Sequence, residues 1–130
     1  MKKLILFLFT LVILAGCGAQ PAQQTQVENV TIQIFDISPS GATVLITDKN
    51  PEPYPYGSWY KLQKMTNDGW QDVPTVIDNY GFDLVGYIPN NRGEVKFTIN
   101  WEWLYGTLPP ATYRILKEVN RQEISIEFQI

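Results

Sequence analysis

EISIEFQI, at residues 123–130, alternates polar and apolar side chains without exception. Because successive side chains of a β-strand point to opposite faces, Ile124, Ile126, Phe128 and Ile130 share one face. Such strict alternation is typical of an antiparallel sheet that buries one face and leaves the other in water. The stretch therefore predicts a strand that runs to residue 130 and turns its apolar face into a core.

The same two-residue period recurs along most of the chain, and Gly, Pro and Asn separate its segments. No segment offers the long apolar stripe of a helix, although residues 101–108 have room for a single helical turn. Seven or eight short strands separated by such turn residues predict an all-β antiparallel sandwich or barrel. The upstream segments are residues 30–34, 42–47, 59–63, 70–73, 94–99 and 112–119, with the short apolar segment 84–88 as a further strand.

The first 17 residues have the pattern of a targeting segment. Positive charge at the start is followed by an apolar run over residues 4–14 and then by two small residues before Cys17. The run, of about 11 residues, is shorter than the ~20 needed to span a bilayer. LAGC at residues 14–17 resembles the lipobox of bacterial lipoproteins, in which the cysteine receives diacylglycerol and the chain is cut just before it. The alternative is an ordinary secretory signal that ends beside a chance cysteine.

The lipobox resemblance implies a protein held on the extracytoplasmic face of the cell membrane by a lipid on Cys17. It divides the chain into a signal peptide (1–16), the lipidated cysteine with a flexible tether (17–26) and one folded domain (27–130). Loss of two lysines with the signal leaves eight basic against thirteen acidic side chains, a balance of −5. An acidic domain of this kind is unsuited to nucleic acid, which selects a basic face.

The residue inventory excludes several kinds of chemistry. The chain has no histidine and one cysteine, which rules out Ser-His-Asp and Cys-His catalysis and zinc sites built on His or Cys. We therefore expect no metal, no cofactor and no enzyme activity. A glycoside hydrolase, the weaker alternative, would need two carboxylates facing each other in a cleft. The candidate carboxylates for it are scattered: Asp72, Asp78, Asp83 and Glu102.

A longer motif occupies residues 100–117, NWEWLYGTLPPATYRILK. It resembles the C-terminal signature of a bacterial immunoglobulin-like domain family, found mainly in lipoproteins and cell-surface proteins of Gram-positive bacteria, with the approximate pattern W-x-W-L-Y-G-x-L-P-x-G-x-Y-R-I-x-K. Residues 56–62 and 69–74 match two earlier elements of that family. The resemblance covers residues 27–130 and implies an immunoglobulin-like sandwich with an adhesive, sensory or accessory role. It implies no catalytic residue. Ala111 stands where the family usually has glycine.

Residues of this motif are assigned structural roles. Tyr113 enters a strand after two prolines, where a tyrosine of an immunoglobulin-like fold can send its hydroxyl back to an upstream backbone group. Trp101 and Trp103 lie two residues apart and would share a face of a strand, and core packing is expected for one of them. Arg114 and Lys117 are assigned to a solvated face, or alternatively to ion pairs with nearby acidic side chains.

The predicted binding surface centres on the Pro-rich loop at residues 50–56. Tyr54 is the preferred binding residue because the prolines beside it hold its backbone extended. Tyr56 is the weaker candidate, because it leads directly into the next strand and packing there is its alternative role. Trp70, Tyr80 and Phe82 would extend the aromatic surface. The expected partner is an unknown envelope protein or a cell-wall glycan. Two alternatives stay open: the loops simply close the end of the sandwich, or the protein is a structural or regulatory subunit of an envelope complex.

Overall fold

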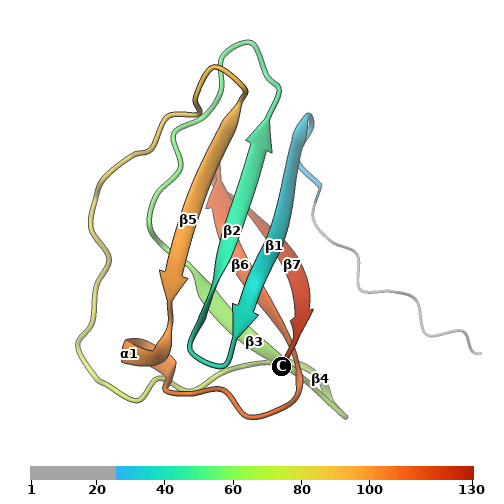
Figure 1. Cartoon of the computed structure of the whole chain (residues 1–130), viewed down its shortest axis with the longest axis vertical. Coiled ribbons are helices and arrows are strands. Elements are labelled where there is room, and N and C mark those ends of the chain that lie inside the picture. The colour runs from blue at the N-terminus through green and yellow to red at the C-terminus, as the bar shows by residue number, and fades with distance from the viewer. Residues whose placement is uncertain (1–25) are drawn as a thin grey trace, which may run out of the picture.

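A computed structural model describes residues 26–130 and shows two antiparallel sheets packed face to face (Figure 1). One sheet has the strand order β1-β2-β5 and the other β4-β3-β6-β7. Within residues 26–130 one short helix, α1 (Glu102–Tyr105), follows β5. The strands are β1 (Val30–Ser38), β2 (Gly41–Asp48), β3 (Lys61–Thr66), β4 (Gly69–Asp72), β5 (Glu94–Asn100), β6 (Thr112–Val119) and β7 (Gln122–Gln129). The predicted β-sandwich is confirmed, with seven strands. The predicted signal peptide, Cys17 and residues 17–25 of the tether lie outside the described residues.

The core lies between the sheets and is built by alternation along the strands. Val44 and Ile46 of β2 face inward with no exposed surface, as do Leu62 of β3 and Ile115 of β6. Burial of such side chains stabilises the fold by roughly 1.5–3 kcal/mol each. The C-terminal strand contributes as predicted: its buried residues are Ile124 and Phe128, and Ile126 and Ile130 pack against the core while half-buried.

A tight turn fixes the pairing of the last two strands. Val119 pairs with Gln122, so only Asn120 and Arg121 connect β6 to β7. Both connecting residues have positive φ, 47° and 62°. Two such residues make a type I′ turn, whose twist matches that of the strands beside it. The turn sets a register that places the apolar face of β7 on the core.

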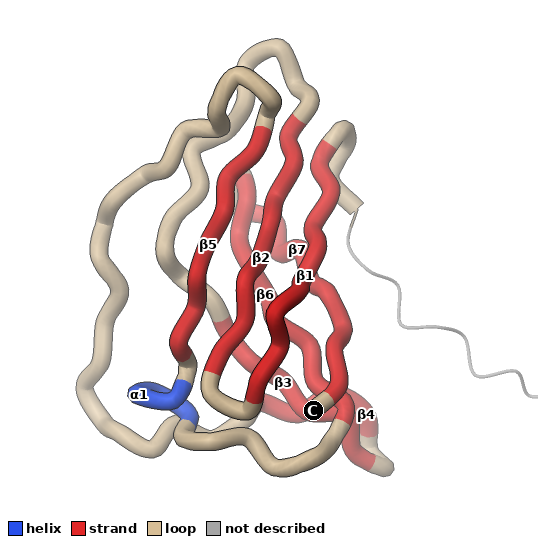
Figure 2. Tube along the Cα trace, viewed as in Figure 1, coloured by secondary structure: helices blue, strands red, loops and turns tan. Residues whose placement is uncertain are grey.

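The predicted strand at residues 84–88 is wrong. In the structure this segment belongs to an irregular connection, residues 73–93, which links β4 to β5 (Figure 2). Leu84 is fully exposed, and the segment contributes only an isolated bridge between Tyr56 and Tyr87. Its apolar residues suggested a strand, but no neighbouring strand supplies a ladder for them within residues 26–130. As a result β5 has a strand on one side only.

Candidate functional site

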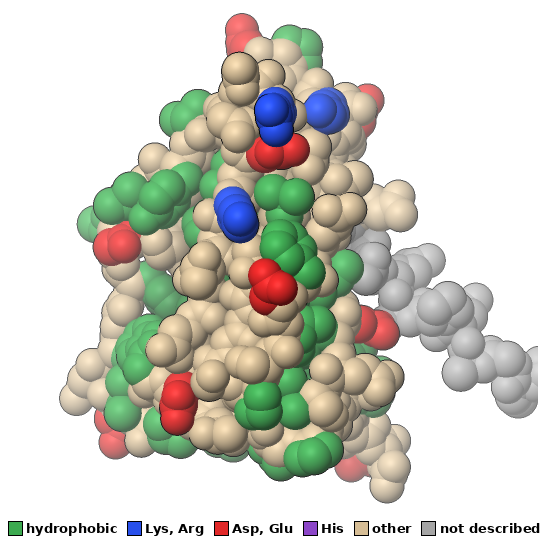
Figure 3. All heavy atoms as spheres, in the orientation of Figure 1, with side chains coloured by type: hydrophobic (Ala, Val, Ile, Leu, Met, Phe, Trp, Pro, Cys, Tyr) green, Lys and Arg blue, Asp and Glu red, His purple; other side chains and the backbone are tan. Residues whose placement is uncertain are grey.

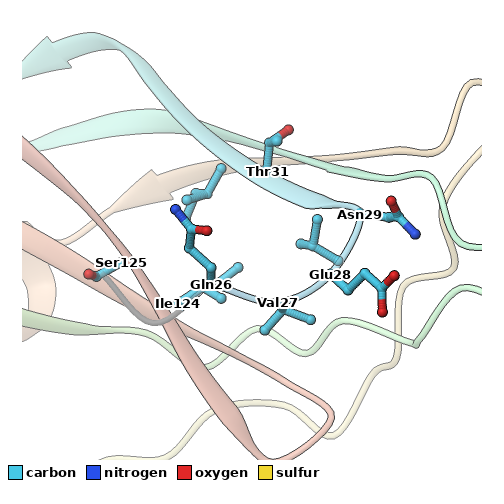
Figure 4. Close-up of a pocket in the computed structure, with 9 residues that line it drawn as sticks. Gln26, Val27, Glu28, Asn29, Thr31, Ile124 and Ser125 are labelled. Atoms are coloured by element: carbon cyan, nitrogen blue, oxygen red, sulfur yellow. The ribbon is translucent and has the colours of Figure 1, made fainter. Parts of the chain in front are cut away.

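One pocket lies beside the start of β1 and has a volume of about 640 Å³ (Figure 4). Residues 26–32 line it, together with Ile124 and Ser125 of β7. Glu28 is the one carboxylate in this lining, and no aromatic ring lines it. The pocket brings together neither paired titratable groups nor a flat apolar surface, and we assign no site to it.

A second hollow, of about 400 Å³, lies between β5 and the connection 73–93, and we call it the aromatic groove. One wall is the strand itself, residues 96–100. The connection supplies the opposite wall. Five aromatic side chains line the groove: Tyr60, Phe82, Tyr87, Phe97 and Trp103. Four separate segments of the chain therefore meet at this place.

Phe82 is the centre of the aromatic cluster. Its ring packs edge-on against Tyr60, with centroids 5.3 Å apart, and against Tyr80 and Trp103, both at 6.2 Å. Such edge-to-face pairs are favourable beyond their buried area. Tyr80 and Trp103 remain 46% and 43% exposed, so they offer ring surface to a ligand. A hydrogen bond from Ser58 Oγ to Asp83 Oδ1 (2.7 Å) ties the connection to the segment before β3.

Tyr60 is the most buried aromatic residue of the groove, with 5% of its surface exposed. Its hydroxyl has no hydrogen-bond partner of normal geometry among the described residues. Burial and, to a smaller extent, the neighbouring Tyr105 raise the pKa of Tyr60 to about 12, and the Trp103 side chain opposes the shift. A buried hydroxyl without a partner costs about 1–3 kcal/mol, so this one is poised to accept or donate a hydrogen bond.

Lys117 lies beneath the groove and corrects the expectation of a solvated face. The side chain is fully buried on β6, and its Nζ donates to the carbonyl oxygens of Gly57 (2.6 Å) and Trp59 (2.8 Å). It also lies 3.9 Å from the centre of the Phe97 ring, which makes a perpendicular contact with the Tyr87 ring. Burial lowers the pKa of Lys117 to about 8. The lysine therefore holds the segment before β3 and one ring of the groove in place.

The Pro-rich loop does not form the predicted aromatic surface. Tyr56 is fully buried, and its hydroxyl donates to Oδ2 of the buried Asp48 at 2.8 Å. Burial and this hydrogen bond raise the pKa of Tyr56 above its usual range. Tyr54 is half-buried and packs against the core instead of standing clear, and its N–H donates to the same carboxylate. The loop thus closes one end of the sandwich around Asp48.

The other predicted binding residues lie apart, two beside the groove and one on β4. Tyr80 borders the aromatic groove through its contact with Phe82. Trp70 lies on β4 of the other sheet, half-buried beneath the Arg114 guanidinium, which is 4.6 Å from its ring centre. Sequence reasoning missed Tyr60, Tyr87 and Phe97 as groove residues. One feature of the sequence could have pointed to the groove. Residues 80–87, YGFDLVGY, form an apolar and aromatic stretch in an exposed loop.

Trp101 and Trp103 do not share a face. Trp101 is the N-cap of α1, and the helical turn that begins there rotates Trp103 away from it. Trp101 is fully buried, stacks on Phe128 and donates from Nε1 to the Pro39 carbonyl at 2.9 Å. Trp103 instead reaches the groove, a role that the sequence did not assign to it. Ala111, where the family usually has glycine, does not have positive φ and carries no left-handed strain.

The Tyr113 hydroxyl donates to the Pro109 carbonyl oxygen at 2.6 Å. We expect Tyr113→Phe to lower the free energy of unfolding by about 0.5–1.5 kcal/mol, the net contribution of one hydrogen bond. Urea unfolding followed by circular dichroism measures this change. Tyr87→Phe is the control, because that tyrosine is exposed. Equal stability of wild type and Tyr113→Phe would contradict a stapling role for this hydroxyl.

Three of the four carboxylates considered for glycoside hydrolysis have separate partners, and the fourth, Asp78, is exposed. Asp72 pairs with Lys61 at 3.1 Å, Asp83 accepts from Ser58, and Glu102 accepts from Thr107. Within residues 26–130, no group of three or more His, Cys, Asp or Glu side chains is placed to hold a metal ion. The described part of the chain also contains no helix long and apolar enough to cross a membrane.

The aromatic groove can hold an apolar or flat ligand and supplies no catalytic pair. Comparison with known proteins agrees with the fold: a model of the bacterial Ig-like domain family matches residues 26–129. No curated protein and no solved structure matches the chain.

Proposed function

The chain belongs to the bacterial Ig-like domain family, and from that premise we propose that it is a lipid-anchored extracytoplasmic protein that binds an envelope partner through the aromatic groove. Domains of this family are in general interaction domains of surface proteins and are not catalytic. The proposed anchor is the lipid on Cys17. The partner would be an envelope protein or a cell-wall glycan. A structural or regulatory subunit of an envelope complex would use the same surface.

The exposed aromatic and apolar surface around the groove carries this proposal. Tyr80 and Trp103 expose nearly half of their surface, and the connection 73–93 adds five exposed aliphatic side chains. Hydrophobic side chains gather on this side of the molecule (Figure 3). Exposed apolar patches mark interaction sites, and Tyr and Trp are enriched in them. The added side chains are Val76, Ile77, Leu84, Val85 and Ile88.

The position of the groove relative to the proposed anchor supports the same function. The described chain begins at one end of the sandwich, where β1 starts, and α1 lies at the opposite end (Figure 1). Trp103 on α1 and the second half of β5 therefore lie far from residue 26. A domain held by a flexible tether at residues 17–26 would be free to turn the groove away from the membrane.

Photo-crosslinking in intact cells tests the proposal. A p-benzoylphenylalanine at position 80 would capture the partner on the full chain. We expect Trp103→Ala to lower recovery of the crosslinked partner at least about tenfold, because truncation of an interface anchor costs roughly 2 kcal/mol or more. Mass spectrometry of the crosslinked band measures recovery.

Two further variants serve as controls. Phe35→Ala removes an aromatic side chain of similar exposure, 38%, from β1, and should leave recovery unchanged. Cys17→Ala removes the thiol, so it should abolish palmitate labelling and release the protein from the membrane fraction. Unchanged recovery with Trp103→Ala would refute the groove, and undiminished labelling of Cys17→Ala would refute the anchor.

A further inference from the structure

β5 has an unpaired edge that forms one wall of the aromatic groove. In an antiparallel ladder the backbone groups of alternate residues point to the same neighbour. Trp101 N–H donates to Ser40 and Gly93 accepts from Asp48, so the odd-numbered residues from 93 to 101 face β2. The even-numbered residues of β5 therefore point their N–H and C=O groups to the other side.

Three of these outward-facing residues have no backbone partner. Glu94 is already engaged, because its carbonyl accepts from Asn90 N–H and its own N–H donates to Asn90 Oδ1, both at 3.0 Å. Lys96, Thr98 and Asn100 have outward N–H and C=O groups that no described residue binds. All three line the aromatic groove. The groove thus offers three donors and three acceptors in a row.

The connection 73–93 does not pair with residues 96–100 and leaves the place of a neighbouring strand open. It runs beside β5 without strand structure (Figure 2). Its one bridge joins Tyr87 to Tyr56, through hydrogen bonds of 2.8 and 2.9 Å, and not to β5. Phe82 and Tyr87 instead face β5 across the groove. The space between them is open to a chain that supplies the missing backbone partners.

We propose that the aromatic groove binds an extended peptide segment of another protein, which adds to the sheet as a strand beside β5. The inference rests on the proposed function and specifies the class of partner. Strand addition to an exposed edge gives affinity through main-chain hydrogen bonds and specificity through pockets for alternate side chains. Here the rings of Phe82, Phe97 and Trp103 select large apolar side chains at every second position of the peptide.

The spacing of the free groups favours a peptide over a glycan. Lys96, Thr98 and Asn100 repeat at intervals of about 6.6 Å, the two-residue repeat of a strand. A peptide of about five residues matches this repeat along residues 96–100. A second copy of the domain is disfavoured, because the connection 73–93 stands where the edge of another sheet would have to approach.

Selection from a phage-displayed library of random linear 12-residue peptides tests the inference, using the full chain in detergent micelles. The key variant is Thr98→Pro, which removes an outward N–H. Proline is tolerated at the free edge of a strand but cannot donate to an added one. Glu127→Pro is the matched control on the outer edge of β7. Ile130 N–H donates to the Ala111 carbonyl, so the even-numbered residues of β7 bond to β6 and the odd-numbered residues, including Glu127, point their backbone groups outward.

The expected result has three parts. Enriched peptides carry large apolar residues at alternate positions, bind wild type and Glu127→Pro equally, and bind Thr98→Pro at least tenfold more weakly. Hydrogen exchange by NMR then slows at the amides of Lys96, Thr98 and Asn100. A peptide N-methylated at the residues that face β5 loses binding, whereas methylation at the intervening residues does not. This last comparison uses wild-type protein and decides the matter even where Thr98→Pro fails to fold.

Other outcomes would overturn strand addition. One is that no peptide is enriched on the wild-type protein, and another is that hydrogen exchange slows only at amides other than those of Lys96, Thr98 and Asn100. Binding of a muropeptide that Thr98→Pro leaves unchanged would point to a glycan, and a dimer that Thr98→Pro dissociates would point to a second copy of the chain. The proposed function is judged separately by crosslinking in cells. If Trp103→Ala abolishes crosslinking and Thr98→Pro does not change it, the groove binds its partner by another mode and only the strand inference fails.

Discussion

Trp101→Ala is expected to lower the free energy of unfolding by about 3–5 kcal/mol, the usual cost of truncating a large buried aromatic side chain. The indole is fully buried, lies 5.3 Å from the Phe128 ring and bonds to the Pro39 carbonyl. It therefore joins the end of β5, the β1–β2 turn and β7. Domains of this size are stable by only about 5–15 kcal/mol, so the variant would be largely unfolded at moderate temperature.

Urea unfolding followed by far-ultraviolet circular dichroism measures this loss independently of tryptophan fluorescence. Trp103→Ala is the matched control, because it makes the same chemical change two residues away on an exposed side chain. We expect it to change stability by less than about 1 kcal/mol. Similar destabilisation by the two variants would contradict the division of one core and one surface tryptophan.

Asp48→Ala should have the second largest effect, a loss of roughly 2–4 kcal/mol. The carboxylate is 2% exposed and accepts four hydrogen bonds. Two come from Asn50, at 2.8 and 2.9 Å, one from the Tyr56 hydroxyl at 2.8 Å and one from Tyr54 N–H at 3.3 Å. Its removal would leave the buried Tyr56 hydroxyl without an acceptor. Chemical denaturation at pH 7 gives the magnitude.

The pH dependence of stability provides a second measurement on Asp48. Burial acts to raise the pKa of Asp48, but the hydrogen bonds from Asn50, Tyr56 and Tyr54 outweigh it and hold the pKa below 3.8. A carboxyl with a depressed folded-state pKa stabilises the fold above its unfolded pKa and loses that contribution as the pH falls. Wild type should therefore lose stability below about pH 4 more steeply than Asp48→Asn. Identical slopes would show that another group is responsible.

Much of the fold could be predicted because alternation is a local property of the chain. The run at residues 123–130 has the same period in the sequence and in β7, and the turns on either side of most strands are visible as Gly, Asn or Pro. The segment 84–88 shows the limit of this reasoning. Its apolar residues suit a strand, but a strand also requires a partner, and the neighbouring backbone of β5 remains unpaired.

The candidate site was harder to predict because long-range contacts decide it. Tyr56 lies at the end of the Pro-rich loop, but its hydroxyl donates a buried hydrogen bond to the carboxylate of Asp48, and this contact holds the ring in the interior. Lys117 looked solvated, but two carbonyls some 60 residues away in sequence bind its ammonium group. Trp103 turned outward because a helical turn begins at Trp101. None of these contacts leaves a periodic signal in the sequence.

The reactivity of the buried Lys117 can also be used to measure how often the two sheets separate. Its ammonium group is enclosed by the Gly57 and Trp59 carbonyls and the Phe97 ring. An amine-reactive acylating agent can meet it only after the two sheets separate locally or globally. The rate at which Lys117 is acylated, compared with the rate for the exposed Lys96, therefore measures how often the sandwich opens transiently under native conditions.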